Sequence, residues 1–429
     1  MPVPIINRIP LEIISYIFRL AYAQRNTVIY DNEIYPGPVQ TTLSLVCREW
    51  RAVVNSCHFL WEDISLRYHI TPESRPYDPQ TCLFSLFLLK SLEWGRPFTI
   101  SLAFRVEAPI TASPGRLSAI INDRANTMGN MLKLQAARLK GFSLMTTPWE
   151  VHSAFLRALE GTNFPILNRW CSSFDGAEAG IVPDMAGPED RIDIFRNMHF
   201  PSLQHLYLEG ALCRWSHFQL NHLTSLSITQ MSDPFRLHPR RLEHILQQNG
   251  GSLQTLSLQG SLYPDPQTYA QELFDDDFPK FSLPRVEELT LGFLTPQEIT
   301  HFMARIAISQ LRELIINNLK SSIPRARMLL ALLSAIVAEF PSLAALQRVT
   351  LRRLRAGSGD VTLTPQQCKD LLQALEQEAE DDDQVDDVGE NADADADEDS
   401  EAETQGQAWG WDDDIELDNE FEWDTDFDV

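Results

Sequence analysis

Residues 200–210, FPSLQHLYLEG, and residues 250–260, GGSLQTLSLQG, share the spacing that decides the fold. In the first stretch, Leu203, Leu206 and Leu208 follow the order L-x-x-L-x-L. The last two leucines are two residues apart, so in a strand both point to one face and the residue between them points to the other. Such a strand has an apolar side that a neighbouring element must cover.

The same spacing recurs along the C-terminal half, with first positions 20 to 35 residues apart. The intervening segments, such as residues 237–250, have the apolar spacing of helices. Neighbouring copies would therefore cover one another and form a parallel sheet. The first positions of the six copies are Leu203, Leu223, Leu253, Val286, Leu311 and Leu346, and two weaker copies begin at Leu139 and Leu167.

This repeat resembles the leucine-rich repeat, which implies an α/β protein with an irregular solenoid over residues 135–375. Residues 67–134 would be a helix–strand linker region that caps the array. The alternative is a general α/β domain with leucine-rich parallel strands.

In the solenoid interpretation, the residue between the last two apolar positions faces outward and lines a concave, substrate-binding face. The last copy adds arginines, which would bind acidic side chains of a substrate or, alternatively, the chain's own acidic tail. The predicted substrate-binding residues are Tyr207, Ser227, Ser257, Thr290, Ile315, Arg348, Thr350 and Arg352.

Residues 9–61 carry a different pattern. IPLEIISYIF (9–18) places isoleucines on one stripe of a short helix, with a proline and an acid where a first turn favours them. A second helix follows in LSLVCREW (43–50), and FLW closes the segment at 59–61. Two helices this short bury too little to be stable alone, so the segment predicts a partner surface.

The segment resembles an F-box, through Ile9-Pro10, Glu12-Ile13 and Ile17-Phe18, then VCREW at 46–50 and Leu60-Trp61. It departs from the family in Ile9, which replaces a leucine, and in a long polar stretch between the helices. We take residues 5–66 as the domain. The resemblance implies docking on a Skp-family adaptor and, through it, a cullin. The residues that would form or support the adaptor-binding surface are Ile9, Pro10, Ile13, Ile17, Leu45, Val46 and Trp50. Of these, we expect Trp50, like Trp61, to lie in the segment's own core, because tryptophan is highly buried on average.

The chain as a whole then resembles fungal F-box proteins, which implies a substrate-recognition subunit of an SCF-type (Skp–cullin–F-box) ubiquitin ligase. The protein substrate remains unknown. Two alternatives stay open: an F-box scaffold that acts outside ubiquitination, and a binder of basic, histone-like proteins that acts through the acidic tail.

The net charge of −25 is concentrated in the tail. Residues 376–429 hold 26 of the 60 acidic residues and no Lys or Arg, so 34 acids face all 35 basic residues elsewhere. The composition predicts a disordered tail. Its end interleaves acids with Trp409, Trp411 and Trp423, a pattern that also suits folding on a basic, apolar groove.

No catalytic motif is present: the chain has no G-x-x-x-x-G-K-[ST], no H-E-x-x-H and no G-x-S-x-G. We therefore expect a non-catalytic adaptor with no cofactor and no metal site. The six scattered cysteines predict reduced thiols. Without an apolar run, a signal-peptide pattern or a basic surface, we expect cytoplasmic or nuclear localisation and neither membrane nor nucleic-acid partners.

Overall fold

The structure is a computed structural model of the chain. It describes residues 9–23, 39–70, 97–106, 114–146, 149–174, 198–210, 215, 220–231, 236–237, 239–260, 281–292, 299, 302–303, 305–317, 325–339, 345–352 and 360–386. The acidic–aromatic end of the chain lies outside these residues.

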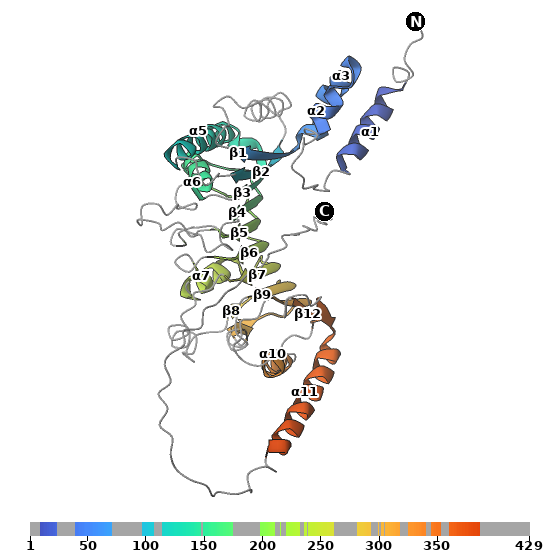
Figure 1. Cartoon of the computed structure of the whole chain (residues 1–429), viewed down its shortest axis with the longest axis vertical. Coiled ribbons are helices and arrows are strands. Elements are labelled where there is room, and N and C mark those ends of the chain that lie inside the picture. Colours follow the sequence, from blue (N-terminus) through green and yellow to red (C-terminus); the bar gives the residue numbers. More distant parts are fainter. Residues whose placement is uncertain are drawn as a thin grey trace, which may run out of the picture.

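One sheet of eleven strands runs through the middle of the molecule (Figure 1). The strands follow one another in chain order, and every neighbouring pair is parallel until the last, where β13 pairs antiparallel with β12. The strands are β1 (Asp63–Ile70), β2 (Phe98–Val106), β3 (Leu139–Thr146), β4 (Arg169–Phe174), β5 (His205–Glu209), β6 (Ser225–Thr229), β7 (Thr255–Gln259), β9 (Glu288–Gly292), β11 (Glu313–Asn317), β12 (Arg348–Arg352) and β13 (Val361–Leu363). A separate small sheet pairs β8 (Phe281–Ser282) with β10 (Ile306–Ala307).

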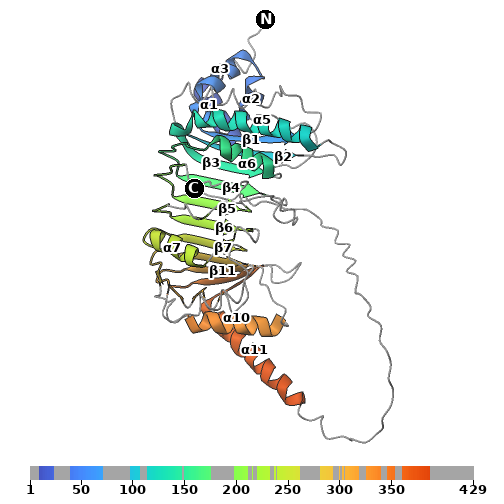
Figure 2. The same ribbon diagram turned by 90° about the vertical axis from the view of Figure 1, so that its left-hand side faces the viewer.

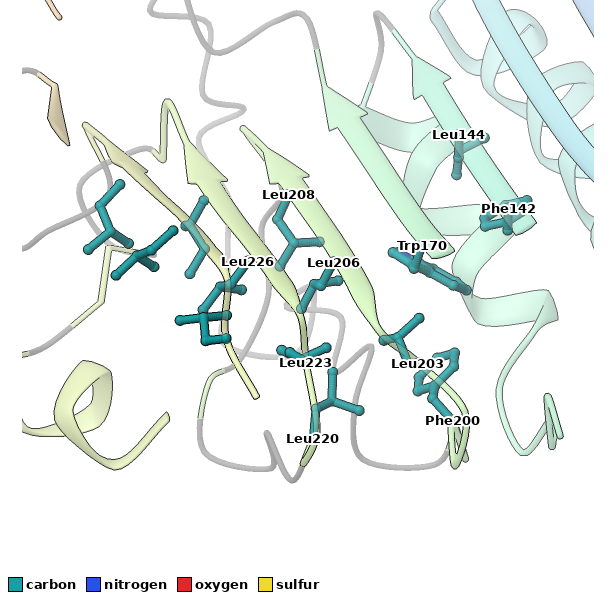
Figure 3. Packing of buried hydrophobic residues seen from close by; sticks show 14 of the residues in the cluster. Phe142, Leu144, Trp170, Phe200, Leu203, Leu206, Leu208, Leu220, Leu223 and Leu226 are labelled. Carbon is teal, nitrogen blue, oxygen red and sulfur yellow. The ribbon is translucent and has the colours of Figure 1, made fainter. Parts of the chain in front are cut away.

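The apolar side of the sheet is a continuous core. Leu206 and Leu208 are fully buried, and parallel pairing puts Leu226 and Ile228 beside them. Figure 3 shows these leucines in successive layers that pass into Phe142 and Trp170. The predicted alternation of inward and outward side chains is therefore present in these strands.

Helices cover this apolar side. Figures 1 and 2 show α5 (Pro114–Lys133), α6 (Trp149–Ala158) and α7 (Pro239–Asn249) on one side of the sheet. At its far end α10 (Arg325–Glu339) packs against α11 (Pro365–Asp386), which also contacts β12 and β13. The side opposite α5, α6 and α7 carries mostly polar side chains over β5 to β12, and we call it the polar face. Its outward residues are His205, Tyr207, Glu209, Ser225, Ser227, Thr229, Thr255, Ser257, Gln259, Glu288, Thr290, Gly292, Glu313, Ile315, Asn317, Arg348, Thr350 and Arg352.

The predicted arrangement of a helical domain followed by a leucine-rich-repeat solenoid is wrong. The α/β class fits, but the structure is one large, mostly parallel sheet with helices packed on it. The sheet does not begin near residue 135, because β1 and β2 pair with each other and β2 pairs with β3. The L-x-x-L-x-L spacing is not specific to a leucine-rich repeat, because any parallel strand buried on one side can produce it.

The segment boundaries shift accordingly. Residues 67–134, expected to be a linker with a helix and a strand that caps the array, contain the end of β1, all of β2 and α5, and these belong to the same sheet and helical layer as the later strands. The tail, expected to be disordered from residue 376, begins within α11, which continues to Asp386. The remaining tail residues, 387–429, lie outside the described residues.

Asn249, at the end of α7, joins this helix to the segment that leads into β6. Its Nδ2 donates to the carbonyl of Leu220 and to that of Ile245, each at 2.9 Å, and its Oδ1 accepts the N–H of Leu223 at 2.9 Å. The side chain is 1% exposed, so these backbone groups have no access to water in its place. The next residue, Gly250, must be a glycine, because a Cβ there would lie 2.7 Å from the carbonyl oxygen of Ser282.

Replacing Asn249 by alanine should lower the free energy of unfolding by about 2–4 kcal/mol, because it leaves buried backbone groups without hydrogen-bond partners. The midpoint of urea unfolding measures this loss. Gln248→Ala, at the exposed neighbouring position, should change it by less than about 0.5 kcal/mol. Equal effects of the two substitutions would contradict the assignment of Asn249 as a buried anchor.

A buried histidine joins α6 to the sheet. His152 is fully buried, with Nδ1 3.0 Å from the Thr146 hydroxyl and Nε2 2.8 Å from the Ser172 hydroxyl. Burial lowers the pKa of His152 to about 3. The ring is therefore neutral in the folded protein at any physiological pH.

Because the folded pKa lies below the ordinary value of 6.5, the unfolded chain binds a proton that the folded chain does not. This stability contribution is complete above pH 6.5 and is lost as the pH falls toward 3. At pH 5 the loss is about 2 kcal/mol relative to pH 7.5. His152→Gln should therefore reduce the stability difference between pH 7.5 and pH 5 by about this amount in denaturant titrations. The same substitution at exposed His244 should preserve the wild-type difference.

Candidate functional site

Three short helices precede the sheet: α1 (Leu11–Ala23), α2 (Val39–Ser44) and α3 (Arg48–Ser56), with a 3-10 turn η3 (His58–Trp61) leading into β1. The Pro10 carbonyl accepts the N–H groups of Ile13 and Ile14 and so opens α1. Cys47 caps α3, because its Sγ accepts the Trp50 N–H at 3.4 Å. The proline and the VCREW stretch thus set where these helices begin.

The helices pack through a small core of their own. Phe18 is fully buried, and its ring meets that of Trp50 edge to face at 4.9 Å. Trp61 is also buried and donates from Nε1 to the Val54 carbonyl at 3.1 Å. Aromatic pairs in this geometry add stability beyond the area they bury, so Phe18 and Trp50 hold α1 against α3.

The other side of α1 is apolar and exposed. Ile13 is 50% exposed and Ile17 is 40% exposed, although Ile14 and Phe18 beside them are buried. Between α2 and α3, Leu45 is 71% and Val46 is 53% exposed. We define the apolar patch as the exposed apolar residues of this helical unit: Leu11, Ile13, Tyr16, Ile17, Leu20, Leu45 and Val46.

The predicted adaptor-binding residues thus divide into two groups. Ile13, Ile17, Leu45 and Val46 are exposed, and so is Pro10. Ile9 and Trp50 are only partly buried, but both pack against the core. The sequence prediction missed Leu11, Tyr16 and Leu20, although the helical spacing of Tyr16 and Leu20 from Ile13 and Ile17 was available as a signal.

A substitution in the core of the helical unit should lower the free energy of unfolding much more than a substitution in the apolar patch. Phe18→Ala should lower the free energy of unfolding by about 3–5 kcal/mol because it leaves a cavity. Ile17→Ser, at the next position, should cost less than about 1 kcal/mol because much of that side chain is already in water. Thermal unfolding followed by tryptophan fluorescence measures both. A larger loss for Ile17→Ser would contradict this division of α1.

The polar face holds the second group of predicted residues. The registers of the parallel pairs place Tyr207, Ser227, Ser257, Thr290 and Ile315 in one row across β5, β6, β7, β9 and β11, and the row continues to Thr350 of β12. Sequence spacing therefore identified residues that the sheet brings together. Arg348 and Arg352 flank the end of this row.

The residues of this row differ in how exposed their side chains are. Tyr207, Ser227 and Ser257 are partly exposed, but Thr290, Ile315 and Thr350 are buried, at 7%, 5% and 4% exposure. A partner approaching the polar face in this structure therefore reaches β5, β6 and β7 more readily than the central residues of the later strands.

Two arginines of the predicted basic patch are paired with carboxylates, whereas Arg353 and Arg355, which the prediction also includes, lie outside the described residues. Arg348 Nη2 lies 2.9 Å from Glu313 Oε2, and Arg352 Nε lies 3.2 Å from Asp360 Oδ2. These exposed pairs contribute little to stability, but they reduce the positive charge available to an acidic ligand.

Glu209 is held in place by neutral donors. Its Oε2 accepts the Ser173 hydroxyl at 2.7 Å and the Tyr207 hydroxyl at 2.9 Å. Burial, followed by the charge of Glu209, raises the pKa of Tyr207, so the phenol stays protonated and continues to donate. Burial likewise raises the pKa of neighbouring Cys171 to about 11, which makes this thiol a poor nucleophile.

A glycine in β9 makes room for a side-chain hydrogen bond between β7 and β11, the strands on either side of it. Gln259 of β7 accepts at Oε1 from Asn317 Nδ2 of β11 at 2.7 Å, although β9 separates their strands. The residue between them is Gly292, where a Cβ would lie 3.0 Å from Gln259 Cγ. A side chain at this position would crowd the bridge, so the glycine makes room for it.

Among the residues that the structure describes, no group of three or more His, Cys, Asp and Glu side chains is placed to hold a metal ion. The described helices also include none that is long and apolar enough to span a membrane. Neither a protein-family model nor a curated protein sequence matches the chain.

Proposed function

We propose that this chain is the substrate-recognition subunit of an SCF-type ubiquitin ligase. The helical unit at residues 9–61 binds a Skp-family adaptor and, through it, a cullin. The polar face of the sheet binds a protein substrate. Ubiquitin transfer is carried out by the other subunits, and this chain is a non-catalytic adaptor.

The observation that carries this proposal is the concentration of exposed apolar side chains in the helical unit. Seven of the eleven large apolar side chains that are exposed in the described part of the chain lie between Leu11 and Val46. Isolated exposed apolar residues are ordinary, but a local group of this kind marks a protein interface. Four of them, Ile13, Ile17, Leu45 and Val46, stand at positions that the F-box resemblance assigns to the adaptor contact.

The proposal also agrees with the internal packing of the unit. Ile14 and Phe18 supply the core, so the neighbouring isoleucines are not needed to hold the helices together. Leaving them in water lowers solubility and adds nothing to the fold. Burial against a partner would contribute about 25 cal/mol for each Å² of apolar surface covered.

Binding to a purified Skp-family adaptor tests the proposal directly. The wild-type chain should form a stable complex in co-purification and calorimetry. Ile13→Asp and Leu45→Asp should each weaken the complex at least about tenfold, a loss of about 1.4 kcal/mol, because each buries a charge in an apolar contact.

Leu134→Asp is the matched control, because Leu134 is an exposed leucine (81%) outside the helical unit. It should leave adaptor affinity unchanged. A wild-type chain that fails to bind, or a control that loses as much affinity as the two variants, would refute the proposal. Adaptor binding without cullin recruitment to the complex would instead favour a scaffold outside ubiquitination.

A further inference from the structure

Two carboxylates of the polar face, Glu209 and Glu288, have no basic ion-pair partner among the described residues, whereas two carboxylates near Glu288 do. Glu287 is paired with Arg312 at 3.2 Å, and Glu313 is paired with Arg348 at 2.9 Å. Within the part of the chain that the structure describes, Glu209 and Glu288 make no ion pair. Among the described residues, the hydroxyls of Ser173 and Tyr207 donate hydrogen bonds to Glu209.

Between these carboxylates the face is small, polar and uncharged. The outward positions of β6 are Ser225, Ser227 and Thr229, and those of β7 are Thr255, Ser257 and Gln259. Most of them are partly exposed. Side chains this short leave room for another chain to approach the sheet closely.

Thr229 adds a second sign that this surface lacks a partner. The residue is 7% exposed, and in the described part of the chain its hydroxyl makes no hydrogen bond of good geometry, although it lies close enough to the Tyr207 hydroxyl to act to lower the pKa of that phenol. A buried hydroxyl without a partner costs free energy. A polar group of a ligand placed at the end of β6 would remove that cost.

The electrostatics of Glu288 favour a cation. Burial, followed by the charge of Glu313, raises the pKa of Glu288. The arginines that lower it, Arg352 and Arg348, belong to β12, two strands away, and are paired with Asp360 and Glu313. A Lys or Arg brought to Glu288 would meet a carboxylate that its own strand neighbours do not neutralise.

We propose that the polar face from β5 to β9 binds an extended basic segment of a protein, with one Lys or Arg at Glu209 and a second at Glu288. Glu209 lies three strands away from Glu288 and four residues further along the strand direction. With strands about 4.8 Å apart and about 3.3 Å per residue, the two sites are roughly 20 Å apart. An extended chain spans this distance in about six residues. The inference rests on the proposed substrate-binding role of the sheet and specifies the substrate class.

The test uses the full chain and a fluorescein-labelled Gly/Ser peptide with two lysines six residues apart, measured by fluorescence anisotropy at low ionic strength. Glu209→Gln combined with Glu288→Gln should weaken binding at least tenfold, because two charge-assisted contacts are lost. The amide keeps the size of the side chain and still accepts from Tyr207. A peptide with two adjacent lysines should bind less tightly to the wild-type chain, because it reaches only one carboxylate.

Glu401→Gln combined with Glu403→Gln is the control, because it removes the same charge from the acidic tail. It should change affinity less than twofold. Equal losses for the two pairs would show that the tail attracts the peptide and would overturn the inference, as would a wild-type chain that does not bind. Adaptor binding by the Glu209/Glu288 variant should remain intact, so failure of this inference is distinguishable from failure of the proposed function.

Discussion

The structure depends on the alignment of apolar side chains from one parallel strand to the next. Leu206, Leu226, Leu256 and Leu289 stand in register, and all are fully buried. A shift of one residue in any strand would turn its leucines to the polar face and break the core at that layer. Both faces are therefore specified together: burying the leucines fixes where Ser227, Ser257 and Glu209 emerge on the other side.

Much of this could be predicted from the sequence, because strand alternation is local. The spacing of Leu203, Leu206 and Leu208 was enough to predict a strand and to assign Tyr207 to the opposite face. The extent of the sheet could not be predicted in the same way, since β1 and β2 lack the leading leucine that marked the later copies. Spacing also could not distinguish a repeat array from one large sheet, because both need strands with one apolar side.

The chemistry of the polar face escaped prediction for a different reason. The sequence predicted a basic patch at Arg348 and Arg352, but each arginine has an acidic partner from another segment. The register of β11 and β12 brings Glu313 to Arg348. The reversal of the chain into β13 brings Asp360 to Arg352. In the helical unit, the sequence showed that α1 has an apolar stripe, but it did not show which of these apolar residues are buried and which are exposed. The contact between Phe18 and Trp50 decides which isoleucines are left in water.

The end of the sheet bears on how copies of this protein behave at high concentration. A parallel sheet of in-register strands offers its edge as a template on which a further strand, from any chain, can pair. Here the last strand, β13, is three residues long and runs against the others, and α11 follows it and packs beside it. Because β13 is short and reversed, it limits edge-to-edge pairing with a neighbouring molecule at this end of the sheet.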